Sequence, residues 1–266
     1  MSKPSQPIGL FDSGIGGLTV AYAILQQLPA ESILYFGDTA RIPYGTKPAE
    51  TIRQYSESIT RFLLSKGCKL IVVACNTASA AALTHLRQLW PDVPIVGMEP
   101  AVKPGAIATR SGKVGVLATA GTFKSQRYAS LMHRFAKSVE LLENPCLGLV
   151  ELIEAGEVDA PRTEELLREV LTPMQAAGAD TFVLGCTHYP FVLPLIRKIA
   201  GPEAAIINPA PAVARQVERL LLERDELSHE ALPRHRFFIS GHDGKFKKMA
   251  ELILGFEVEV EEGILL

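Results

Sequence analysis

The chain has 266 residues, of which 47% are hydrophobic, and this is enough to build two compact α/β units with cores of their own. Its 27 basic and 29 acidic residues nearly balance and form no basic block, which argues against a nucleic-acid partner and favours a small-molecule one. No apolar run approaches the roughly 18 residues that span a bilayer, and the opening MSKPSQP lacks the apolar core of a secretion signal. We therefore expect a soluble cytoplasmic protein with no membrane partner.

The predicted elements alternate along the chain. Short, nearly continuous apolar runs are followed by longer segments with helical periodicity, a pattern typical of parallel strands covered by crossover helices. The predicted strands are residues 8–11, 33–36, 70–74, 95–97, 114–117, 139–142, 182–185 and 206–208, with a closing pair at 237–240 and 256–260. Among the helices, 49–66 and 163–177 have the clearest amphipathic pattern.

The order of elements repeats within the chain. Strand 8–11 aligns with 114–117 at an offset of 106, and IVVACNT (71–77) aligns with FVLGCTH (182–188) at an offset of 111. We therefore predict an α/β fold of two similar, pseudo-symmetric domains, each a mainly parallel sheet flanked by helices, with the active site between them. Residues 1–97 with 211–266 are predicted to form the first domain, and residues 98–210 the second.

Cys75 and Cys186 occupy equivalent places in the two halves. Cys75 ends an apolar strand, at the sheet edge where open α/β folds bind ligands, and Asn76 and Thr77 follow it at a predicted helix N-terminus. Unpaired donors there lower a thiol pKa. A single cysteine after a strand is most often a small buried hydrophobe, but the matched pair favours two reactive thiols.

Cys186 repeats this context, since Thr187 and His188 follow it, and His188 is a candidate to orient or protonate a group in the site. Cys68 and Cys146 lack the pattern and are interpreted as structural. None of the four cysteines has a CxxC neighbour or a paired histidine spacing, so we expect reduced thiols and neither a metal nor a disulfide.

Three further segments carry candidate residues. Asp12 and Ser13 open a glycine loop after the first strand, which suits a substrate carboxylate or ammonium better than a pyrophosphate; the alternative is that they only cap a helix. Pro43, Tyr44 and Gly45 form either a simple turn or a loop whose amides cover a ligand. Glu151 lies on a predicted helix, where most acidic residues are merely solvated.

Two opposed thiols suit one reaction in particular. Inverting a stereocentre requires a base on one face of the carbon and an acid on the other, with donors that stabilise the carbanion. The expected donors are Thr77, Thr119, Thr122 and Thr187. No motif for pyridoxal phosphate or another cofactor is apparent.

Several motifs, in order along most of the chain, resemble the aspartate/glutamate racemase family. They are PIGLFDSGIGGLTV (7–20), GDTARIPYG (37–45), VACNTASA (73–80), GVLATAGT (115–122), VELIEAG (150–156) and GCTHYP (185–190). The resemblance implies cofactor-independent interconversion of L- and D-glutamate in the cytoplasm, which supplies D-glutamate for peptidoglycan and so for cell-wall synthesis and cell shape. Family members commonly dimerise, so we expect a homodimer.

The resemblance also implies roles for individual residues. Cys75 would deprotonate D-glutamate and Cys186 would deprotonate L-glutamate. Asp12, Glu151 and His188 would assist these thiols. The residues implied in substrate binding are Ser13, Tyr44, Gly45, Asn76, Thr77, Thr187 and His188. Because only seven residues precede the first strand, activation by a cell-wall precursor is not expected.

Three alternatives remain open at this stage. The same chemistry could act on aspartate or a hydantoin. A non-catalytic amino-acid-binding protein on the same fold would need neither thiol. A thiol redox protein is disfavoured because 111 residues separate the two cysteines and neither has a CxxC partner.

Overall fold

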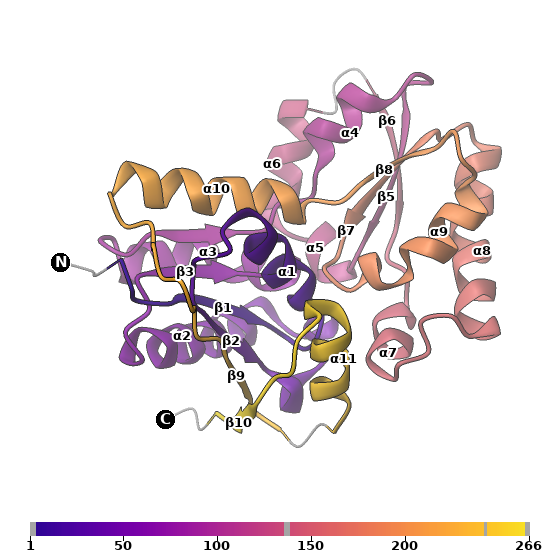
Figure 1. Cartoon of the computed structure of the whole chain (residues 1–266). Helices are drawn as coiled ribbons and strands as arrows, with labels where there is room; N and C mark the ends of the chain where they lie inside the picture. Colours follow the sequence, from indigo (N-terminus) through magenta and orange to yellow (C-terminus); the bar gives the residue numbers. More distant parts are fainter. Residues whose placement is uncertain (1–3, 136–138, 242–243, 264–266) are drawn as a thin grey trace. The chain divides into compact units, whose positions relative to one another are not determined.

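The computed structural model describes residues 4–135, 139–241 and 244–263, and its chain divides into two compact units (Figure 1). Unit 1 comprises Met1–Met98 with Ala210–Leu266, and unit 2 comprises Glu99–Pro209. Unit 2 is thus inserted into unit 1, and both ends of the chain belong to unit 1. In the described part of the chain we find no helix with the length and apolar character of a membrane span.

Unit 1 is built on a six-stranded sheet in the order β10-β9-β2-β1-β3-β4, with all neighbouring strands parallel. Its strands are β1 (Ile8–Asp12), β2 (Ile33–Gly37), β3 (Leu70–Val73), β4 (Ile95–Gly97), β9 (Arg236–Ile239) and β10 (Val260–Glu262). Its α-helices are α1 (Leu18–Gln27), α2 (Ala49–Ser65), α3 (Asn76–Leu89), α10 (Ala210–Glu223) and α11 (Gly244–Leu254). Two 3-10 turns, η1 (Thr39–Arg41) and η2 (Tyr44–Thr46), follow β2.

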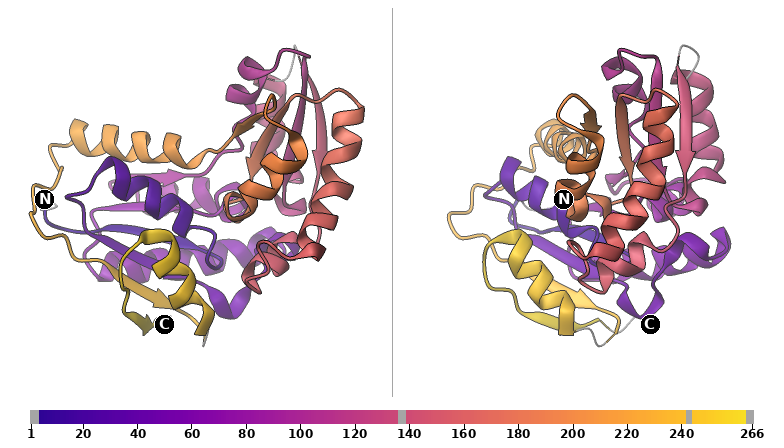
Figure 2. Two further views of the ribbon diagram at one scale, coloured as in Figure 1. Left: turned by 45° about the vertical axis from the view of Figure 1, so that its right-hand side comes forward. Right: turned by 90° about the vertical axis from the view of Figure 1, so that its right-hand side faces the viewer.

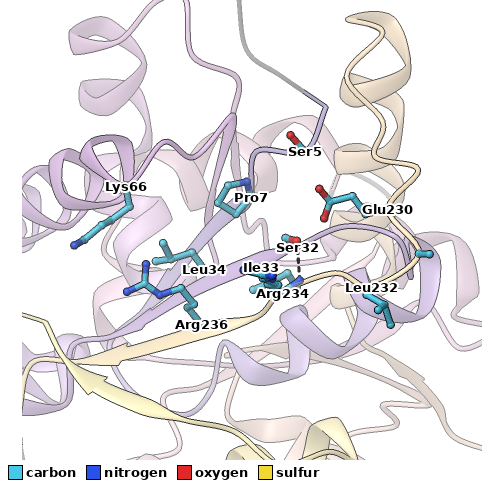
Figure 3. Close-up of a pocket in the computed structure, with 11 residues that line it drawn as sticks. Ser5, Pro7, Ser32, Ile33, Leu34, Lys66, Glu230, Leu232, Arg234 and Arg236 are labelled. Atoms are coloured by element: carbon cyan, nitrogen blue, oxygen red, sulfur yellow. Dashed lines mark hydrogen bonds between the residues drawn. The ribbon is translucent and has the colours of Figure 1, made fainter.

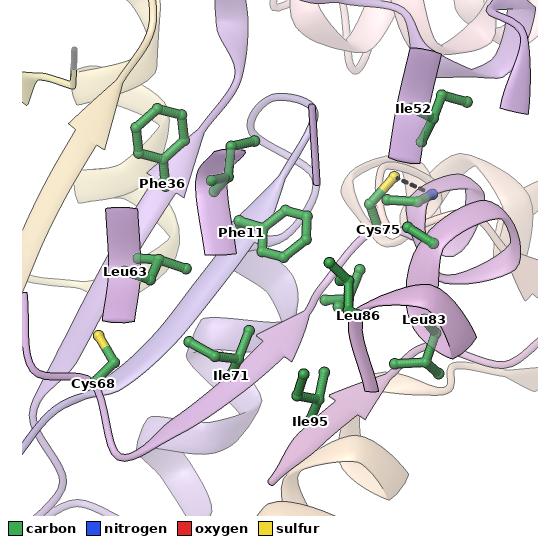
Figure 4. Close-up of a cluster of buried hydrophobic side chains, with 14 of the residues drawn as sticks. Phe11, Phe36, Ile52, Leu63, Cys68, Ile71, Cys75, Leu83, Leu86 and Ile95 are labelled. Carbon is green, nitrogen blue, oxygen red and sulfur yellow. Dashed lines mark hydrogen bonds between the residues drawn. The ribbon is translucent and has the colours of Figure 1, made fainter. Parts of the chain in front are cut away.

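Alternate residues of the unit 1 strands face two helical layers. Phe11, Phe36 and Ile71 form one buried cluster with Leu63 of α2 and Leu86 of α3 (Figure 4). On the other face, the ring of Tyr35 contacts that of Phe246 of α11, with 5.8 Å between centroids. Helix α10 lies alongside α1 (Figure 2). Burial on both faces explains why the strands β1 to β4 are almost entirely apolar, whereas the edge strand β10 (VEE) is not.

Unit 2 repeats the central part of this topology. Its four parallel strands are ordered β6-β5-β7-β8, which corresponds to β2-β1-β3-β4 of unit 1, and this confirms the predicted internal repeat. The strands are β5 (Lys113–Ala118), β6 (Glu140–Asn144), β7 (Thr181–Gly185) and β8 (Ala205–Ile207). The helices are α4 (Val102–Ala108), α5 (Ala120–Phe123), α6 (Gln126–Phe135), α7 (Leu149–Glu154), α8 (Pro161–Ala176) and α9 (Leu193–Ala200), with the 3-10 turn η3 (Tyr189–Val192) before α9.

The predicted last strand was wrong. Residues 256–259 are irregular, and pairing begins only at Val260, opposite Phe237. The apolar side chains that suggested a strand pack in other ways, because Phe256 stacks on His235 with 5.2 Å between ring centroids and Val258 is buried. The other predicted strands, and both predicted helices, begin and end within two residues of those observed.

A buried ion pair joins distant segments of unit 1. The Lys69 ammonium lies 2.7 Å from a Glu31 carboxylate oxygen, and both side chains are fully buried. Lys69 also donates to the carbonyl oxygens of Pro4 (2.6 Å) and Glu226 (2.7 Å), and the other Glu31 oxygen accepts from the Ser228 N–H at 2.8 Å. The pair therefore fixes the N-terminal segment and the chain after α10 to the start of the sheet.

Replacing Lys69 with Met should lower the free energy of unfolding by about 3–5 kcal/mol, because it leaves the Glu31 carboxylate buried without its cation. Urea denaturation measures this change. The double variant Lys69→Met, Glu31→Gln should recover part of the loss. Arg219→Met, which breaks the exposed Arg219–Glu223 pair, is the control and should change stability little. If Lys69→Met and Arg219→Met lowered the free energy of unfolding equally, the Lys69–Glu31 pair would not have the stabilising role assigned to it.

In unit 2, a carboxylate holds together the turns that precede two strands. Asp180, just before β7, accepts from the Thr109 hydroxyl (2.6 Å) and from the N–H groups of Arg110 and Ser111 (2.8 Å each). Burial opposes the charged form, but these hydrogen bonds outweigh it and lower the pKa of Asp180 to about 2. The charged carboxylate therefore stabilises the folded state.

Because the folded pKa of Asp180 is depressed, its contribution should be present above about pH 5 and lost as the pH falls toward 2. Asp180→Asn should destabilise the protein by about 1 kcal/mol at neutral pH, since solvent screens this partly exposed group. Urea denaturation at pH 7, 4 and 3 should show that the difference in free energy of unfolding between wild type and variant becomes smaller as the pH falls. The exposed Asp159→Asn serves as control, and a gap that does not change with pH would disprove the linkage.

Candidate active site

In unit 1, three chemically active side chains follow adjacent strands at one edge of the sheet. Asp12 ends β1, Asp38 follows β2, and Cys75 lies two residues beyond β3. The backbone continues this alignment past the strands, since the Asp38 N–H donates to the Asp12 carbonyl oxygen at 2.9 Å and the Ala74 N–H to that of Phe11 at 2.8 Å. Parallel pairing thus gathers these residues at the edge where such sheets bind ligands.

Asp12 is fully buried and organises the glycine loop. Its Oδ1 atom accepts from the Gly14 N–H at 2.8 Å, and the Ser13 hydroxyl lies 3.5 Å away. The suggestion that Asp12 and Ser13 cap a helix is wrong, because α1 begins later, at Leu18, with Gly17 as its uncapped N-cap residue. A side chain at Gly17 would meet the Asp12 Cβ atom at 2.7 Å, so this glycine allows the close approach.

Cys75 is the N-cap residue of α3, so a helix N-terminus follows it, as the sequence predicted. Its backbone is extended (φ −118°, ψ 125°), and its Sγ atom accepts from the Ala78 N–H at 3.4 Å. Asn76 and Thr77 are buried in the first turn of the helix. Both polar atoms of the Asn76 amide are buried without a hydrogen-bond partner among the described residues, which is costly unless a ligand supplies one.

Asp38 is a buried residue of this edge that the sequence did not single out as a site residue. It accepts from the Tyr44 hydroxyl (2.5 Å), the Ser240 hydroxyl (2.6 Å) and the Arg41 guanidinium (3.3 Å). Burial and the charge of Asp38 hold the pKa of Tyr44 well above its ordinary value, so Tyr44 remains a neutral donor. This network fixes the turn formed by Pro43, Tyr44 and Gly45.

In unit 2, the equivalent edge carries Cys186 directly after β7 and Thr119 directly after β5. Thr119 caps α5 by accepting from the Thr122 N–H at 3.4 Å, and the two hydroxyls lie 3.1 Å apart. Thr187 is buried next to Cys186. Cys186, Thr187 and Thr119 therefore lie at one edge of the unit 2 sheet.

The context of Cys186 differs from that of Cys75, so the expectation that it repeats a helix N-terminus was wrong. The Tyr189 N–H donates to the Cys186 carbonyl oxygen at 3.2 Å, and the chain then forms the 3-10 turn η3 before α9 begins at Leu193. Pro190 has no N–H to donate and favours such a short turn. Cys186 obtains its polar neighbour from a side chain instead.

That neighbour is His188. Its Nδ1 atom lies 3.7 Å from the Cys186 Sγ atom, and its Nε2 atom lies 2.5 Å from an oxygen of Glu154. Burial would lower the pKa of His188, but the hydrogen bonds to Cys186 and Glu154 and the negative charge of Glu154 raise it well above its ordinary value. A thiol, an imidazole and a carboxylate in sequence can hold and move a proton.

The carboxylate that contacts His188 is that of Glu154. The sequence had suggested Glu151 as the assisting carboxylate, and this was wrong. Both lie on α7, but Glu151 is exposed in the first turn, whereas Glu154 ends the helix against His188. The charge of Glu151 contributes instead to the raised pKa of Tyr189, which is due mainly to burial. The two glutamates are three residues apart on one helix, so periodicity alone could not separate them.

The remaining cysteines have no ionised form near neutral pH. Burial raises the pKa of Cys68 and of Cys146 to about 12 each, so both stay protonated, consistent with structural roles. Within residues 4–135, 139–241 and 244–263, no group of three or more His, Cys, Asp or Glu side chains is arranged to hold a metal ion.

The fold and these paired sites place the chain in a known class of isomerases. The model of the Asp/Glu/Hydantoin racemase family matches residues 9–217, and the chain belongs to that family. It is 49% identical to the glutamate racemase of Ectopseudomonas mendocina (strain ymp) over 260 aligned residues. These residues cover 98% of this chain and 99% of that protein.

Solved structures give the same result. The crystal structure of a glutamate racemase from Bacillus anthracis superposes with a TM-score of 0.89 at 35% identity, over 98% of both chains. That of the glutamate racemase from Francisella tularensis, in complex with D-glutamate, has a TM-score of 0.86 at 34% identity, also over 98% of both chains.

If Glu154 holds the proton on His188, Glu154→Gln should lower the pKa of His188, because it removes the negative charge next to Nε2. The imidazole resonances of His188, followed by NMR against pH, measure the shift. Glu151→Gln is the matched control on the same helix and should leave the His188 titration unchanged. A shift of similar size in both variants would mean that the His188–Glu154 contact is not the cause.

Proposed function

We propose that this chain is a glutamate racemase that interconverts L- and D-glutamate without a cofactor. The observation that carries the proposal is the pair of cysteines, Cys75 and Cys186, which follow the equivalent strands β3 and β7 of two units with the same topology. The close similarity to glutamate racemases over almost the whole chain supports glutamate as the substrate.

The proposed reaction uses the two thiols in opposite roles. One cysteine, as thiolate, takes the α-proton, so that the C–H bond breaks and its electron pair remains on the α-carbon. The other cysteine, as thiol, then donates its proton to the opposite face of that carbon. We assign Cys75 to D-glutamate and Cys186 to L-glutamate, as the family resemblance implies.

Neighbouring groups would support the two thiols. In the first unit we assign Asp12 as the assisting carboxylate; in the second we assign His188, positioned by Glu154. The Asn76 amide, which has no hydrogen-bond partner in the part of the chain that the structure describes, is suited to a substrate carboxylate or ammonium group, because it has both a donor and an acceptor. The remaining proposed binding residues are Ser13, Pro43, Tyr44, Gly45, Thr77, Thr119, Thr122 and Thr187.

Donors among these residues would also stabilise the carbanion. The Thr119 and Thr122 hydroxyls form a pair after β5. Preorganised donors of this kind contribute most where water is excluded. The D-glutamate formed would supply peptidoglycan synthesis, and we expect the protein to act in the cytoplasm as a homodimer with no nucleic-acid partner.

The decisive experiment incubates the pure protein with L-glutamate in deuterated water without added cofactor, and follows optical rotation and loss of the α-proton by NMR. We expect rotation to decay to zero with deuterium at the α-carbon. Cys75→Ser and Cys186→Ser should each reduce racemisation by at least ~10²-fold, because each removes an acid–base group. Cys68→Ser removes a buried thiol outside the site and is the matched control.

Other outcomes would identify the competing functions. Glutamate binding with neither loss of rotation nor deuterium incorporation would favour a non-catalytic binding protein and overturn the proposal. Faster turnover of L-aspartate than of L-glutamate, in the same assay, would retain the two-thiol chemistry and overturn the assignment of the substrate.

A further inference from the structure

A hollow lies at the edge of the unit 1 sheet opposite to the candidate active site. It has a volume of about 610 Å³ and is formed by the segment before β1, the start of β2, the residue that follows α2 and the stretch that leads into β9 (Figure 3). The active-site residues follow the carboxyl ends of these strands, whereas this pocket opens at their amino ends. Strands of five residues separate the two edges by roughly 16 Å, so this pocket is not part of the site described above.

The pocket carries three cations and one acid. The cations are Lys66, Arg234 and Arg236, and the acid is Glu230. Arg236 pairs with Glu261 through three contacts, of 2.9, 3.0 and 3.1 Å, made by its Nη2 and Nε atoms, so its other terminal nitrogen, Nη1, is the one left for a ligand. Among the described residues, no carboxylate lies within 4.0 Å of the Lys66 ammonium or the Arg234 guanidinium, so these two charges remain available.

The charges are separated along the pocket. Lys66 and Arg236 lie at one end, and Glu230 and Ser5 at the other (Figure 3). An aromatic ring brings the two cations together, since the Lys66 Nζ atom lies 5.8 Å and the Arg236 Cζ atom 4.8 Å from the centroid of Phe238. The arrangement suits a ligand with an anionic group at one end and hydroxyl groups at the other.

The walls are held in place by contacts of their own. The Ser32 hydroxyl accepts from the Arg234 N–H at 2.9 Å, and His235 Nδ1 accepts from the Ile33 N–H at 3.3 Å. The buried Lys69–Glu31 pair fixes Pro4 and Ser228, which flank the lining segments. The pocket is therefore formed without a ligand, as small-molecule sites usually are.

We propose that this pocket binds a small phosphorylated polyol. Its phosphate group would contact Lys66, Arg234 and Arg236, because guanidinium groups match phosphate geometry and an ammonium adds a point charge. Its hydroxyl groups would donate to Glu230 and exchange hydrogen bonds with Ser5. The volume lies within the range of about 300–1,000 Å³ of small-molecule sites.

Isothermal titration calorimetry with inorganic phosphate, glucose 6-phosphate and glucose tests the proposal on the whole protein. We expect saturable binding of glucose 6-phosphate, weaker binding of phosphate and none of glucose. Lys66→Gln and Arg234→Gln should each weaken both phosphate ligands about tenfold, the effect of one charge-assisted hydrogen bond. Glu230→Gln should weaken glucose 6-phosphate but not inorganic phosphate.

Lys248→Gln, an exposed cation on α11 outside the pocket, is the matched control and should change no affinity. Because the altered side chains are exposed, or partly so in the case of Glu230, equal melting temperatures should show that the variants fold normally. Absence of saturable binding by either phosphate compound would overturn the proposal, as would a Lys248→Gln loss equal to that of Arg234→Gln. Equal affinity for glucose 6-phosphate and inorganic phosphate would overturn the proposal that the pocket recognises the polyol part of the ligand. No readout depends on racemisation, so this test stands apart from the proposed function.

Discussion

Every strand pair in both sheets is parallel, and the site depends on this constraint. Parallel neighbours require crossover connections, usually helices, so each strand ends at the same edge and the chain leaves it there. The residues that follow adjacent strands are then close to one another however far apart they are in sequence. Asp12, Asp38 and Cys75 meet in unit 1 for this reason, as do Thr119 and Cys186 in unit 2.

The features that the sequence predicted well are those with a local cause. A strand buried on both faces must be almost entirely apolar, and such runs mark the central strands clearly in a chain with 21% charged residues. The repeat is visible because the same order of strands and helices was retained in both units. Cys75 and Cys186 were found because each comes directly after one of these apolar runs.

The features that it missed depend on contacts between distant segments or on a choice between helix neighbours. Asp38 is buried and accepts hydrogen bonds from Tyr44 and Ser240. Nothing near Asp38 in the sequence indicates the contact with Ser240, which is 202 positions away. Glu154 meets His188, 34 positions away, and only the folded unit distinguishes it from Glu151. The last strand was placed too early because the apolar residues that suggested it have other contacts: Phe256 stacks on His235 while staying partly exposed, and Val258 is buried without strand pairing.

The insertion of unit 2 has a consequence for synthesis on the ribosome. Strand β2 (ILYFG) lies between β1 and β9, yet β9 follows the whole of unit 2 in the chain. One edge of this apolar strand therefore stays open for roughly 10–40 s, since about 200 further residues emerge at ~5–20 per second. Unit 2, which is one continuous segment, can finish folding during that interval. The C-terminal strand β9 thus covers, late in synthesis, a strand edge that could otherwise pair with another chain. A chain whose synthesis stopped before β9 would leave that edge exposed.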